Sequence, residues 1–596
     1  MLFPQQNDCR NTLDLSGFWS FKLDPNEVGE TENWFNGLTD ARQIAVPASW
    51  NEQFEDTRDY LGMAWYVQTT FVPSNWKGQR IFLRVGSANY AAKVWVNGHL
   101  VGEHLGGHLP FSFEISEQLN WQAENMVAIS VENHLKPTRV PPGNVQGGAM
   151  STMMGSYPSA NFDFFPYAGL HRPVSLFALP KTHIEDVTVV TDLEQSTGIV
   201  NVTVKQANGN LEGKVKLEGE GVGLESELTF SEGEATASFS IPDARLWSPH
   251  DPYLYKLDIT LSDGGETVDR YDLDIGIRTV EVRGKELLLN GEPIFLKGFG
   301  KHEDFPIHGR GLNRPLLVRD NSLFKWLGAN SYRTAHYPYS EEALQLADRE
   351  GILIIDETPA VGLFFEDGPE NIATRLEQCK QQLSSLIARD KNHPSVIMWS
   401  VANEPFPPHM IQRFMGGEVP PLDPATTDFF KELFEVARTQ DPSRLATVVG
   451  IHGCPTEWLE LSDVIFINRY YGWYSEAGQI EVGKEKLADE VDALFNQLQK
   501  PIVISEFGTD TVAGSHSNPP EMFTEEYQVE FLRAYLDVAD ERDFMVGMHV
   551  WNFADFKTGQ GTRRVNGLNL KGVFTRDRRP KMAAHFLRER WFEEAK

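Results

Sequence analysis

Short runs in which apolar and polar residues alternate dominate the first third of this chain. WYVQTTFV at 65–72 and QRIFLRVG at 79–86 have the two-residue period of half-buried strands. KVWVNGHLVGE contains two such runs around Asn97-Gly98, a dipeptide that favours a tight hairpin turn. Strands that follow one another in this way predict a β-sandwich of the jelly-roll type over residues 1–180.

A second segment repeats the strand pattern more sparsely. DVTVVTDL at 186–193, EATASFSI at 234–241 and YLYKLDITLSD at 253–263 are separated by stretches rich in Gly, Asp and Glu. A segment of this length with this many strands predicts an immunoglobulin-like β-sandwich over residues 181–278. The segment contains no cysteine pair, so the pattern of an antibody domain is absent.

The pattern changes again in the last segment, where continuous apolar runs alternate with amphipathic helical stretches. One helical stretch carries Ile372, Leu376 and Cys379 at helical spacing. Continuous apolar strands are what a parallel sheet covered on both faces requires. Eight strand–helix units predict a (β/α)8 TIM barrel over residues 279–596. The eight runs are IFLKGFG, NSYRTAH, ILIIDE, VIMWSVANE, ATVVG, VIFINRYY, IVISEFG and GMHVWNF.

Charge narrows the possible partners of the protein. The formal net charge of the 596 residues is −30. Such a charge disfavours nucleic acid and anionic membrane surfaces. Because screening confines a global field to about 8 Å at physiological salt, a local cation can still bind an anionic small molecule.

Cysteine content and hydropathy predict the compartment. Three cysteines (Cys9, Cys379 and Cys454) are too few and too scattered for a disulfide framework or a zinc site. The first residues, MLFPQQNDCRNTLDL, show no secretory signal, and the chain has no apolar run of membrane-spanning length. We therefore expect a cytoplasmic protein.

The predicted barrel draws attention to the polar residues that end its strands, because barrel active sites lie there. Glu404 ends the fourth apolar run and Glu506 the seventh, so the two carboxyls face each other across the mouth. A separation of about 5–5.5 Å would suit retaining glycoside hydrolysis, and about 6.5–9.5 Å would suit inversion. Arg333, on the second strand, is a neighbour that would keep Glu506 charged. The other polar residues at strand ends are His302, Asp304, His336, Asp356, Glu357, Asn403, Asn468, Arg469, Tyr470, Tyr471 and Trp551.

Two other interpretations apply to these strand ends. A single Glu at a strand end is commonly a salt-bridged rim residue, although two of them on facing strands argue against that reading. His302, Asp304 and His336 suggest a metal site, but their spacing is not a zinc signature, and polar strand ends bind sugar hydroxyls equally well.

Several longer motifs resemble glycoside hydrolase family 2. NSYRTAHYPY at 330–339 and DKNHPSVIMWSVANEP at 390–405 are similar to the two signatures of that family. NFDFFPYAGLHRPV at 161–174 resembles the end of its jelly roll, and RLWSPHDPYLYKL at 245–257 the end of its middle domain. NRYYGWY, ISEFG, WNFADF and a late Asn-x-Lys are similar to the β-glucuronidases within the family.

The resemblance implies a role for each candidate residue. Glu404 would be the general acid/base, Glu506 the nucleophile, and Arg333 its supporting cation. Asn403 would bind the sugar 2-hydroxyl, a contact that strengthens in the transition state. The remaining substrate-binding candidates are Asp163, His336, Tyr470, Tyr474, Trp551, Asn569 and Lys571.

The Asn-x-Lys pair has a physical rationale in such an enzyme. A glucuronide differs from a glucoside by a carboxylate at C5, and Asn569 and Lys571 offer an amide N–H and a cation. With Tyr474 they would hold this carboxylate. A neutral sugar would leave Lys571 desolvated and unpaired, so we expect glucosides and galactosides to be rejected.

Two of the chain's departures from the family pattern bear on the predicted site. VNGLN has one residue more than expected before Asn569, which leaves open whether Arg563 or Arg564 takes the place of the family's arginine. PFPPHMIQRFMGGEVPP at 405–421 reads as an inserted loop, since it is rich in Pro and Gly. Its apolar residues either pack onto the barrel or a neighbouring subunit, or contribute to the aglycone site. They are Phe406, Met410, Phe414 and Met415.

Taken together, these features predict a retaining exo-β-glucuronidase that acts on small β-glucuronides without a cofactor or a metal. β-Galacturonidase and neutral-sugar enzymes such as β-galactosidase are the alternatives within the family. A non-catalytic carbohydrate-binding protein is the alternative from another class, disfavoured by the presence of both Glu404 and Glu506. The resemblance also implies a homo-oligomer, with a tetramer as one form.

Overall fold

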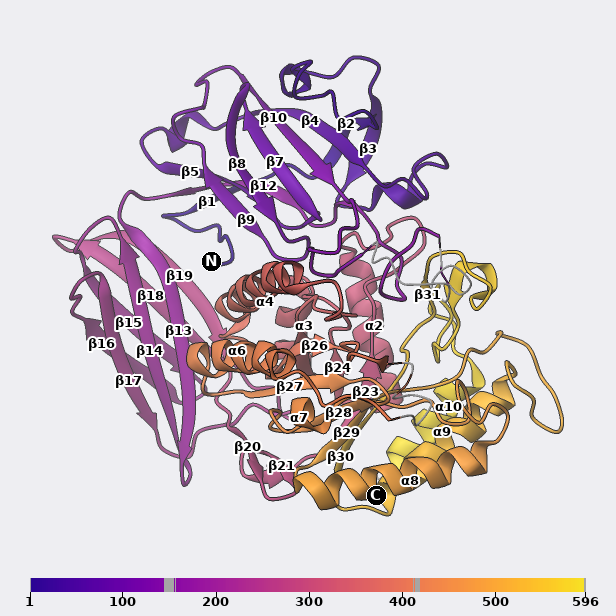
Figure 1. The fold of residues 1–596 in the computed structure, drawn as a ribbon. Coiled ribbons are helices and arrows are strands. Elements are labelled where there is room, and N and C mark those ends of the chain that lie inside the picture. Colours follow the sequence, from indigo (N-terminus) through magenta and orange to yellow (C-terminus); the bar gives the residue numbers. More distant parts are fainter. Residues whose placement is uncertain (1, 144–154, 156, 411, 413–417, 594–596) are drawn as a thin grey trace.

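The computed structural model describes residues 2–143, 155, 157–410, 412 and 418–593. Figure 1 shows the N-terminal sandwich at the top, a second sandwich at the left and the barrel with its helices below and between them. Phe414 and Met415 of the predicted inserted loop lie outside the described residues.

The N-terminal region folds into two facing antiparallel sheets, as the alternating pattern predicts. Their strand orders are β1-β12-β5-β9 and β3-β2-β4-β10-β7-β8. β7 and β8 form the hairpin predicted at Asn97-Gly98, whose φ angles of 50° and 82° suit a tight turn. The strands are β1 Asn11–Asp14, β2 Gly17–Asp24, β3 Arg42–Val46, β4 Met63–Phe71, β5 Arg80–Val85, β6 Ala88–Asn89, β7 Ala91–Val96, β8 His99–Leu105, β9 Phe111–Glu114, β10 Glu124–Glu132, β11 Gly169–Leu170 and β12 Val174–Leu179.

The second sandwich consists of the sheets β13-β14-β17 and β16-β15-β18-β19. Burial alternates residue by residue along its strands, for example through Ala235, Ala237 and Phe239 of β17, which face the core. The strands are β13 His183–Glu194, β14 Thr197–Ala207, β15 Glu212–Gly219, β16 Val222–Leu228, β17 Glu234–Ile241, β18 Tyr255–Asp263 and β19 Glu266–Ile275.

The last region forms a closed parallel barrel in the order β23 to β30. Each of the eight apolar runs becomes one barrel strand, so the fold class predicted from the sequence is confirmed. The barrel strands are β23 Leu296–Gly300, β24 Ser331–Arg333, β25 Leu353–Glu357, β26 Val396–Asn403, β27 Leu445–Gly450, β28 Ile465–Asn468, β29 Ile502–Phe507 and β30 Met545–Val550. Smaller strands are β20 Val280–Arg283, β21 Glu286–Leu289, β22 Glu292–Pro293, β31 Phe556–Lys557 and β32 Leu568–Asn569.

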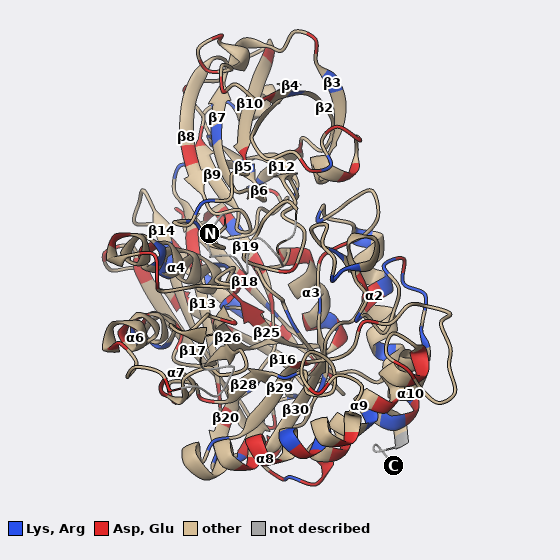
Figure 2. Ribbon diagram, turned by 45° about the vertical axis from the view of Figure 1, so that its right-hand side comes forward, with Lys and Arg blue, Asp and Glu red and all other residues tan. Residues whose placement is uncertain are grey.

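Helices cover the outside of the barrel. The predicted amphipathic stretch forms α4, which buries Cys379, Leu383 and Leu386 against the barrel. Acidic and basic residues are interspersed along α8, α9 and α10 (Figure 2). The helices are α2 Arg314–Leu327, α3 Glu341–Glu350, α4 Pro369–Asp390, α6 Pro424–Gln440, α7 Thr456–Leu459, α8 Ile480–Leu498, α9 Glu525–Asp540 and α10 Met582–Glu593.

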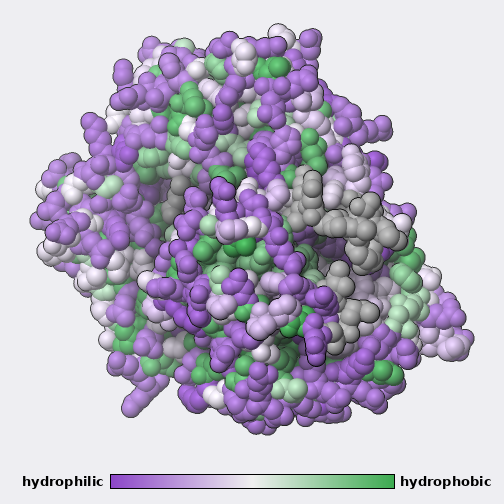
Figure 3. Space-filling model, in the orientation of Figure 1, coloured by the Kyte–Doolittle hydropathy of each residue, from purple (hydrophilic) through white to green (hydrophobic). Residues whose placement is uncertain are grey.

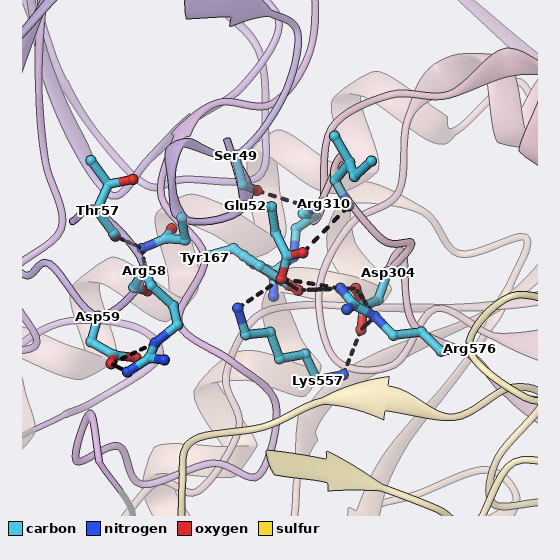
Figure 4. Close-up of polar contacts among 12 residues, drawn as sticks. Ser49, Glu52, Thr57, Arg58, Asp59, Tyr167, Asp304, Arg310, Lys557 and Arg576 are labelled. Carbon is cyan, nitrogen blue, oxygen red and sulfur yellow. Dashed lines mark hydrogen bonds and ion pairs between the residues drawn. The ribbon is translucent and has the colours of Figure 1, made fainter. Parts of the chain in front are cut away.

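A network of charged side chains joins the N-terminal sandwich to the barrel (Figure 4). Glu52 of the sandwich accepts from Lys557 at 2.7 Å, and the Tyr167 hydroxyl donates to Asp304 at 3.0 Å. Arg576 donates to Asp304 at 2.6 Å and to the Tyr167 oxygen at 2.7 Å. The Asp304 carboxylate therefore takes part in the contact between the two regions.

A backbone seam continues from this network toward the barrel mouth. The Tyr157 N–H donates to the Gln560 carbonyl at 2.8 Å, and the Gln560 N–H donates back at 2.7 Å. The Phe165 N–H donates to the Lys557 carbonyl at 2.9 Å. Because these bonds fix the segment on either side of Asp163, they deliver that side chain of the N-terminal sandwich to the barrel.

Hydrophilic residues cover most of the face of the molecule that Figure 3 shows. The hydrophobic residues of this face form small separate patches. Among the helices in the described part of the chain, each is too short or too polar to cross a bilayer.

Candidate active site

Glu506 lies at the end of β29, where two donors hold its carboxylate. Arg333, at the end of β24, donates from Nη2 to Glu506 Oε1 at 2.5 Å. The Tyr470 hydroxyl donates to the other oxygen, Oε2, at 2.8 Å. Arg333 is fully buried and Glu506 is 4% exposed, so this ion pair is shielded from water. The structure therefore brings Arg333 and Tyr470 to Glu506 as the sequence predicts.

Arg333 is shared with a second carboxylate, Glu357 at the end of β25. Its Nη1 donates to both Glu357 oxygens at 2.7 Å. Glu357 also lies 2.8 Å from His336 Nδ1 and accepts from the Ser400 hydroxyl at 2.7 Å. Burial alone would raise the pKa of Glu357, but Arg333 and these hydrogen bonds lower it below the ordinary value. Glu357 thus stays ionised and fixes Arg333 in place.

Glu404 follows β26 in an unusual backbone conformation. Its φ of 45° lies in the left-handed region, which costs a residue with a side chain roughly 1–2 kcal/mol. Its N–H donates to the Val449 carbonyl of β27 at 2.9 Å, and Asn468 Nδ2 donates to its carboxyl at 3.0 Å. This turn directs the carboxyl into the barrel mouth, next to Asn403, whose Oδ1 accepts from Arg333 at 3.2 Å.

The two carboxyls have different electrostatic surroundings. Burial raises the pKa of Glu404, and its hydrogen bond from the neutral Asn468 amide opposes this only in part. Burial also raises the pKa of Glu506, to about 8, against the opposing effect of Arg333, and the Glu404 charge adds to the rise. Two carboxyls that repel each other in a desolvated site favour a form with one proton between them. The guanidinium and the phenol that hold Glu506 favour its ionised form, so Glu404 is the better placed of the two carboxyls to hold that proton.

The predicted Asn-x-Lys lies across the mouth from these carboxyls. Lys571 is 1% exposed, and its Nζ donates to the Tyr474 hydroxyl at 2.9 Å and to the Asp510 carboxylate. The sequence-based expectation that a neutral sugar would leave Lys571 unpaired did not include this internal partner. A buried ammonium without a counter-ion would be strongly disfavoured, and Asp510 supplies that counter-ion.

Asn569 and Asp163 meet beside Lys571. The Lys571 backbone N–H donates to Asn569 Oδ1 at 3.1 Å, which sets the amide so that its NH2 group faces outward. That NH2 group donates to Asp163 Oδ2 at 2.8 Å. The N-terminal sandwich therefore contributes an acidic side chain to the pocket, as predicted.

The structure also answers which arginine belongs to the pocket. Arg564 donates to Asp163 at 2.5 Å, to Asp510 at 3.1 Å and to the Tyr474 hydroxyl at 3.1 Å, whereas Arg563 lies exposed at the surface. The segment VNGLN includes a turn in which Asn566 adopts a φ of 56°. Asparagine tolerates this left-handed conformation better than most residues.

Trp551 and His336 form an aromatic wall. Their rings stack with centroids 5.0 Å apart and planes 17° apart. His302 packs on Phe556 with ring centroids 4.2 Å apart, and burial lowers the pKa of His302 well below the ordinary value. Because Asp304 is held in the network between the regions, the structure does not bring His302, Asp304 and His336 together as a metal site. Within the described ranges, no group of three His, Cys, Asp or Glu side chains could hold a metal ion.

The beginning of the inserted loop packs onto the barrel. The Phe406 N–H donates to the Leu363 carbonyl at 2.6 Å, and Phe406 pairs with Phe364 in a short bridge. Met410 is half-buried. Residues 411 and 413–417 are not among those described, so an aglycone role for this loop stays a hypothesis.

Family descriptions match the chain from end to end. Residues 280–595 match "Glycosyl hydrolases family 2, TIM barrel domain", which is more than half of the chain. The chain belongs to glycoside hydrolase family 2. Residues 13–180 match the family's sugar binding domain and residues 182–278 its further domain. The resemblance seen in the sequence motifs is thereby confirmed, and the protein is a glycoside hydrolase.

Relatives within family 2 are similar over their whole length. The β-glucuronidase of Paenibacillus borealis is 43% identical, with 100% of this chain and 99% of the relative covered. The β-glucuronidase of Homo sapiens is 39% identical, with 100% and 93% covered. The crystal structure of the Ruminococcus gnavus β-glucuronidase superimposes with a TM-score of 0.91 at 39% identity, covering 99% of both chains.

Three residues of this family 2 site carry no assigned role in the sequence reasoning. Glu357 and Asn468 are visible there as polar strand ends, and that position is the signal that could have marked them. Asp510 lies four residues after Glu506 in a loop, where no periodicity identifies it. Only the fold brings Asp510 to Lys571, 61 residues further along the chain.

Proposed function

We propose that this family 2 enzyme is a retaining exo-β-glucuronidase, which hydrolyses β-D-glucuronides to glucuronate and an aglycone. The observation that carries the proposal is a buried Lys571 ammonium, with the Asn569 amide and the Tyr474 hydroxyl beside it, in the mouth that holds Glu404 and Glu506. A uronate carboxylate is the substrate group that this cation and these donors suit. The Ruminococcus gnavus β-glucuronidase, a relative, has been solved in complex with D-glucuronic acid.

The proposed reaction has two displacements. Glu506 attacks the anomeric carbon and forms a glycosyl ester, while Glu404 gives its proton to the departing glycosidic oxygen. Glu404 then takes a proton from water, and the resulting hydroxide attacks the anomeric carbon and releases Glu506. Two inversions at the same carbon retain the β configuration. Neither displacement uses a metal or an organic cofactor.

The other predicted residues take positions that suit substrate binding. Asn403 lies beside Glu404 and would bind the 2-hydroxyl. Tyr470 bonds to Glu506 at 2.8 Å, so it is placed to stabilise the carboxylate before attack and the ester oxygen afterwards. His336 and Trp551 would line the sugar ring. Asp163 would accept from sugar hydroxyls, because its carboxylate is 44% exposed.

A chromogenic panel tests the proposal. We expect turnover of p-nitrophenyl β-D-glucuronide and little or none of the matching galactoside. Preference for the galacturonide would identify the enzyme as a β-galacturonidase, which needs the same carboxylate site. Turnover of the galactoside alone would refute carboxylate recognition, and no turnover at all would favour a carbohydrate-binding protein. Proton NMR of the first-formed anomer would test retention, because initial release of α-glucuronate would refute it.

We also propose a cytoplasmic location and a homo-oligomer, with a tetramer as one form. Among the described residues the three cysteines form no disulfide, which suits a reducing compartment. Cell fractionation and light scattering at several concentrations measure these two properties directly.

A further inference from the structure

A buried carboxylate lies behind the cations of the uronate pocket. Asp510 is 4% exposed and accepts from Lys571 Nζ, from Arg564 Nη1 at 3.1 Å and from the Leu570 N–H at 2.9 Å. Burial would raise the pKa of Asp510, but Lys571 and Arg564 lower it below the ordinary value, so the group is ionised. Asp510 therefore bridges both cations that face the proposed glucuronate carboxylate.

The hydrogen-bond donors of Lys571 show what this bridge leaves for a substrate. An ammonium has three N–H bonds. One of them points to Asp510 and one to the Tyr474 oxygen, so within the described structure a single N–H is left for a ligand. Because the first two partners fix the direction of the third bond, Asp510 both neutralises the ammonium and aims it.

The pocket is also balanced in charge before any substrate enters. Lys571 and Arg564 are opposed by Asp510 and Asp163, which are all joined by direct ion pairs. Asp163 is partly exposed and can exchange its partners for sugar hydroxyls, whereas Asp510 has its side chain only 6% exposed. Asp510 is thus the fixed negative charge that any incoming uronate must approach.

We propose that Asp510 is the internal counter-ion of the uronate pocket and sets how strongly the enzyme distinguishes uronates from neutral sugars. This inference rests on the proposed function and adds a specificity-determining residue to it. Asp510 keeps Lys571 charged when the pocket is empty. It also weakens the attraction for the substrate anion, which shares Lys571 with it.

The substitution Asp510→Asn tests the charge while keeping the size and one acceptor for the Leu570 N–H. Without Asp510, Lys571 would lie buried beside Arg564 with no carboxylate partner of its own among the described residues, which disfavours its charged form in the variant. We expect inhibition by D-glucuronate to be retained in the acidic range and then lost by roughly tenfold as pH rises, more steeply than in the wild type. Inhibition by D-glucose, which lacks the carboxylate, should show no such loss.

Asp555→Asn is the matched control. Asp555 accepts from the Gly572 N–H at 3.0 Å and from the buried Lys581 at 2.8 Å, so it holds the same segment through the same kinds of bond. Lys581 donates its other two N–H bonds to the Thr511 and Leu570 carbonyls, whereas Lys571 keeps one for the pocket. The control should show no new pH dependence of glucuronate binding. If both variants lose glucuronate and glucose inhibition equally at every pH, Asp510 only positions the segment and the proposal is wrong.

A second comparison remains informative if Asp510→Asn alone does not fold. Lys571→Met leaves the Asp510 charge facing the substrate, whereas Lys571→Met with Asp510→Asn removes the buried pair together. We expect the double variant to recover several-fold of the kcat/KM for p-nitrophenyl β-D-glucuronide that the single variant loses. A double variant equal to or worse than the single one would overturn the proposal. If the wild type itself accepts no uronide, the proposed function fails instead, and this inference falls with it.

Discussion

Replacing Lys571 by Met removes the pocket ammonium while keeping a side chain of similar length. In the proposed complex this ammonium donates its remaining N–H to the glucuronate carboxylate. A hydrogen bond between charged groups contributes about 1.5–3 kcal/mol, which corresponds to roughly a 10- to 150-fold change in rate. Because the substitution also leaves Asp510 facing the substrate anion, we expect a loss toward the upper end of that range.

The assay compares two substrates that differ only at C5. Values of kcat/KM for p-nitrophenyl β-D-glucuronide and for the matching glucoside are measured with the wild type and with Lys571→Met. The glucuronide should lose the full factor, while the glucoside should change by less than about threefold, since it has no carboxylate to lose. The ratio of the two substrates therefore reports carboxylate recognition separately from any general damage.

Lys581→Met provides a matched control for this experiment. Lys581 is buried to a similar degree, at 2% exposure, and donates to Asp555 and two backbone carbonyls of the same region. It does not face the pocket, so its loss should lower the thermal midpoint and change both substrates alike. An equal loss on glucuronide and glucoside in Lys571→Met itself would refute the reasoning that assigns Lys571 to the carboxylate.

Four further outcomes follow from the site and its surroundings. Glu506→Gln should remove turnover yet leave D-glucuronate binding within about tenfold by calorimetry. Glu404→Ala should slow phenyl β-D-glucuronide at least about tenfold more than the p-nitrophenyl compound, because the better leaving group needs less protonation. The pKa on the acidic side of the kcat/KM profile should lie between the ordinary carboxyl value of 4.5 and about 8, since Glu506 must lose its proton to attack. Burial lowers the pKa of His549 to about 3 and of His104 to about 4. The free energy of unfolding should therefore be at its full value above pH 6.5 and fall as the pH drops below it, by about 1.4 kcal/mol per pH unit for each histidine. A urea midpoint that stays constant over this pH range would contradict this.

The fold could be predicted from the sequence because its information is local and periodic. Alternation with a period of two gives the sandwich strands, such as Glu234–Ile241, in which every second residue is buried. Continuous apolar runs give the barrel strands, such as Ile502–Phe507, in which every residue is buried. Both patterns follow from which faces of a strand are covered, and neither depends on distant residues.

The strand pattern alone predicts the site only as far as it lies on those strands, and the candidates beyond them came from the resemblance to glycoside hydrolase family 2. Glu404 and Glu506 follow from their positions at strand ends, since the closed barrel brings the ends together. Asp163 and Arg564, 401 residues apart, meet because two different regions dock. Asp510 belongs to a loop whose path no period determines. Sequence patterns therefore located the candidate reacting groups and missed Glu357 and Asp510, the carboxylates that hold the neighbouring cations.

At each end of the pocket, a buried carboxylate (Glu357 or Asp510) holds the cation that faces the reaction. Arg333 is held by Glu357 before it meets Glu506, and Lys571 is held by Asp510 before it meets a substrate. A cation fixed by an internal carboxylate needs no rearrangement when the reaction begins, which is the condition under which electrostatic stabilisation is most effective. The same carboxylates limit how much positive charge either end presents. We infer that the site favours fixed direction over maximum attraction, because each cation keeps a permanent partner and offers its remaining donors to the reacting groups.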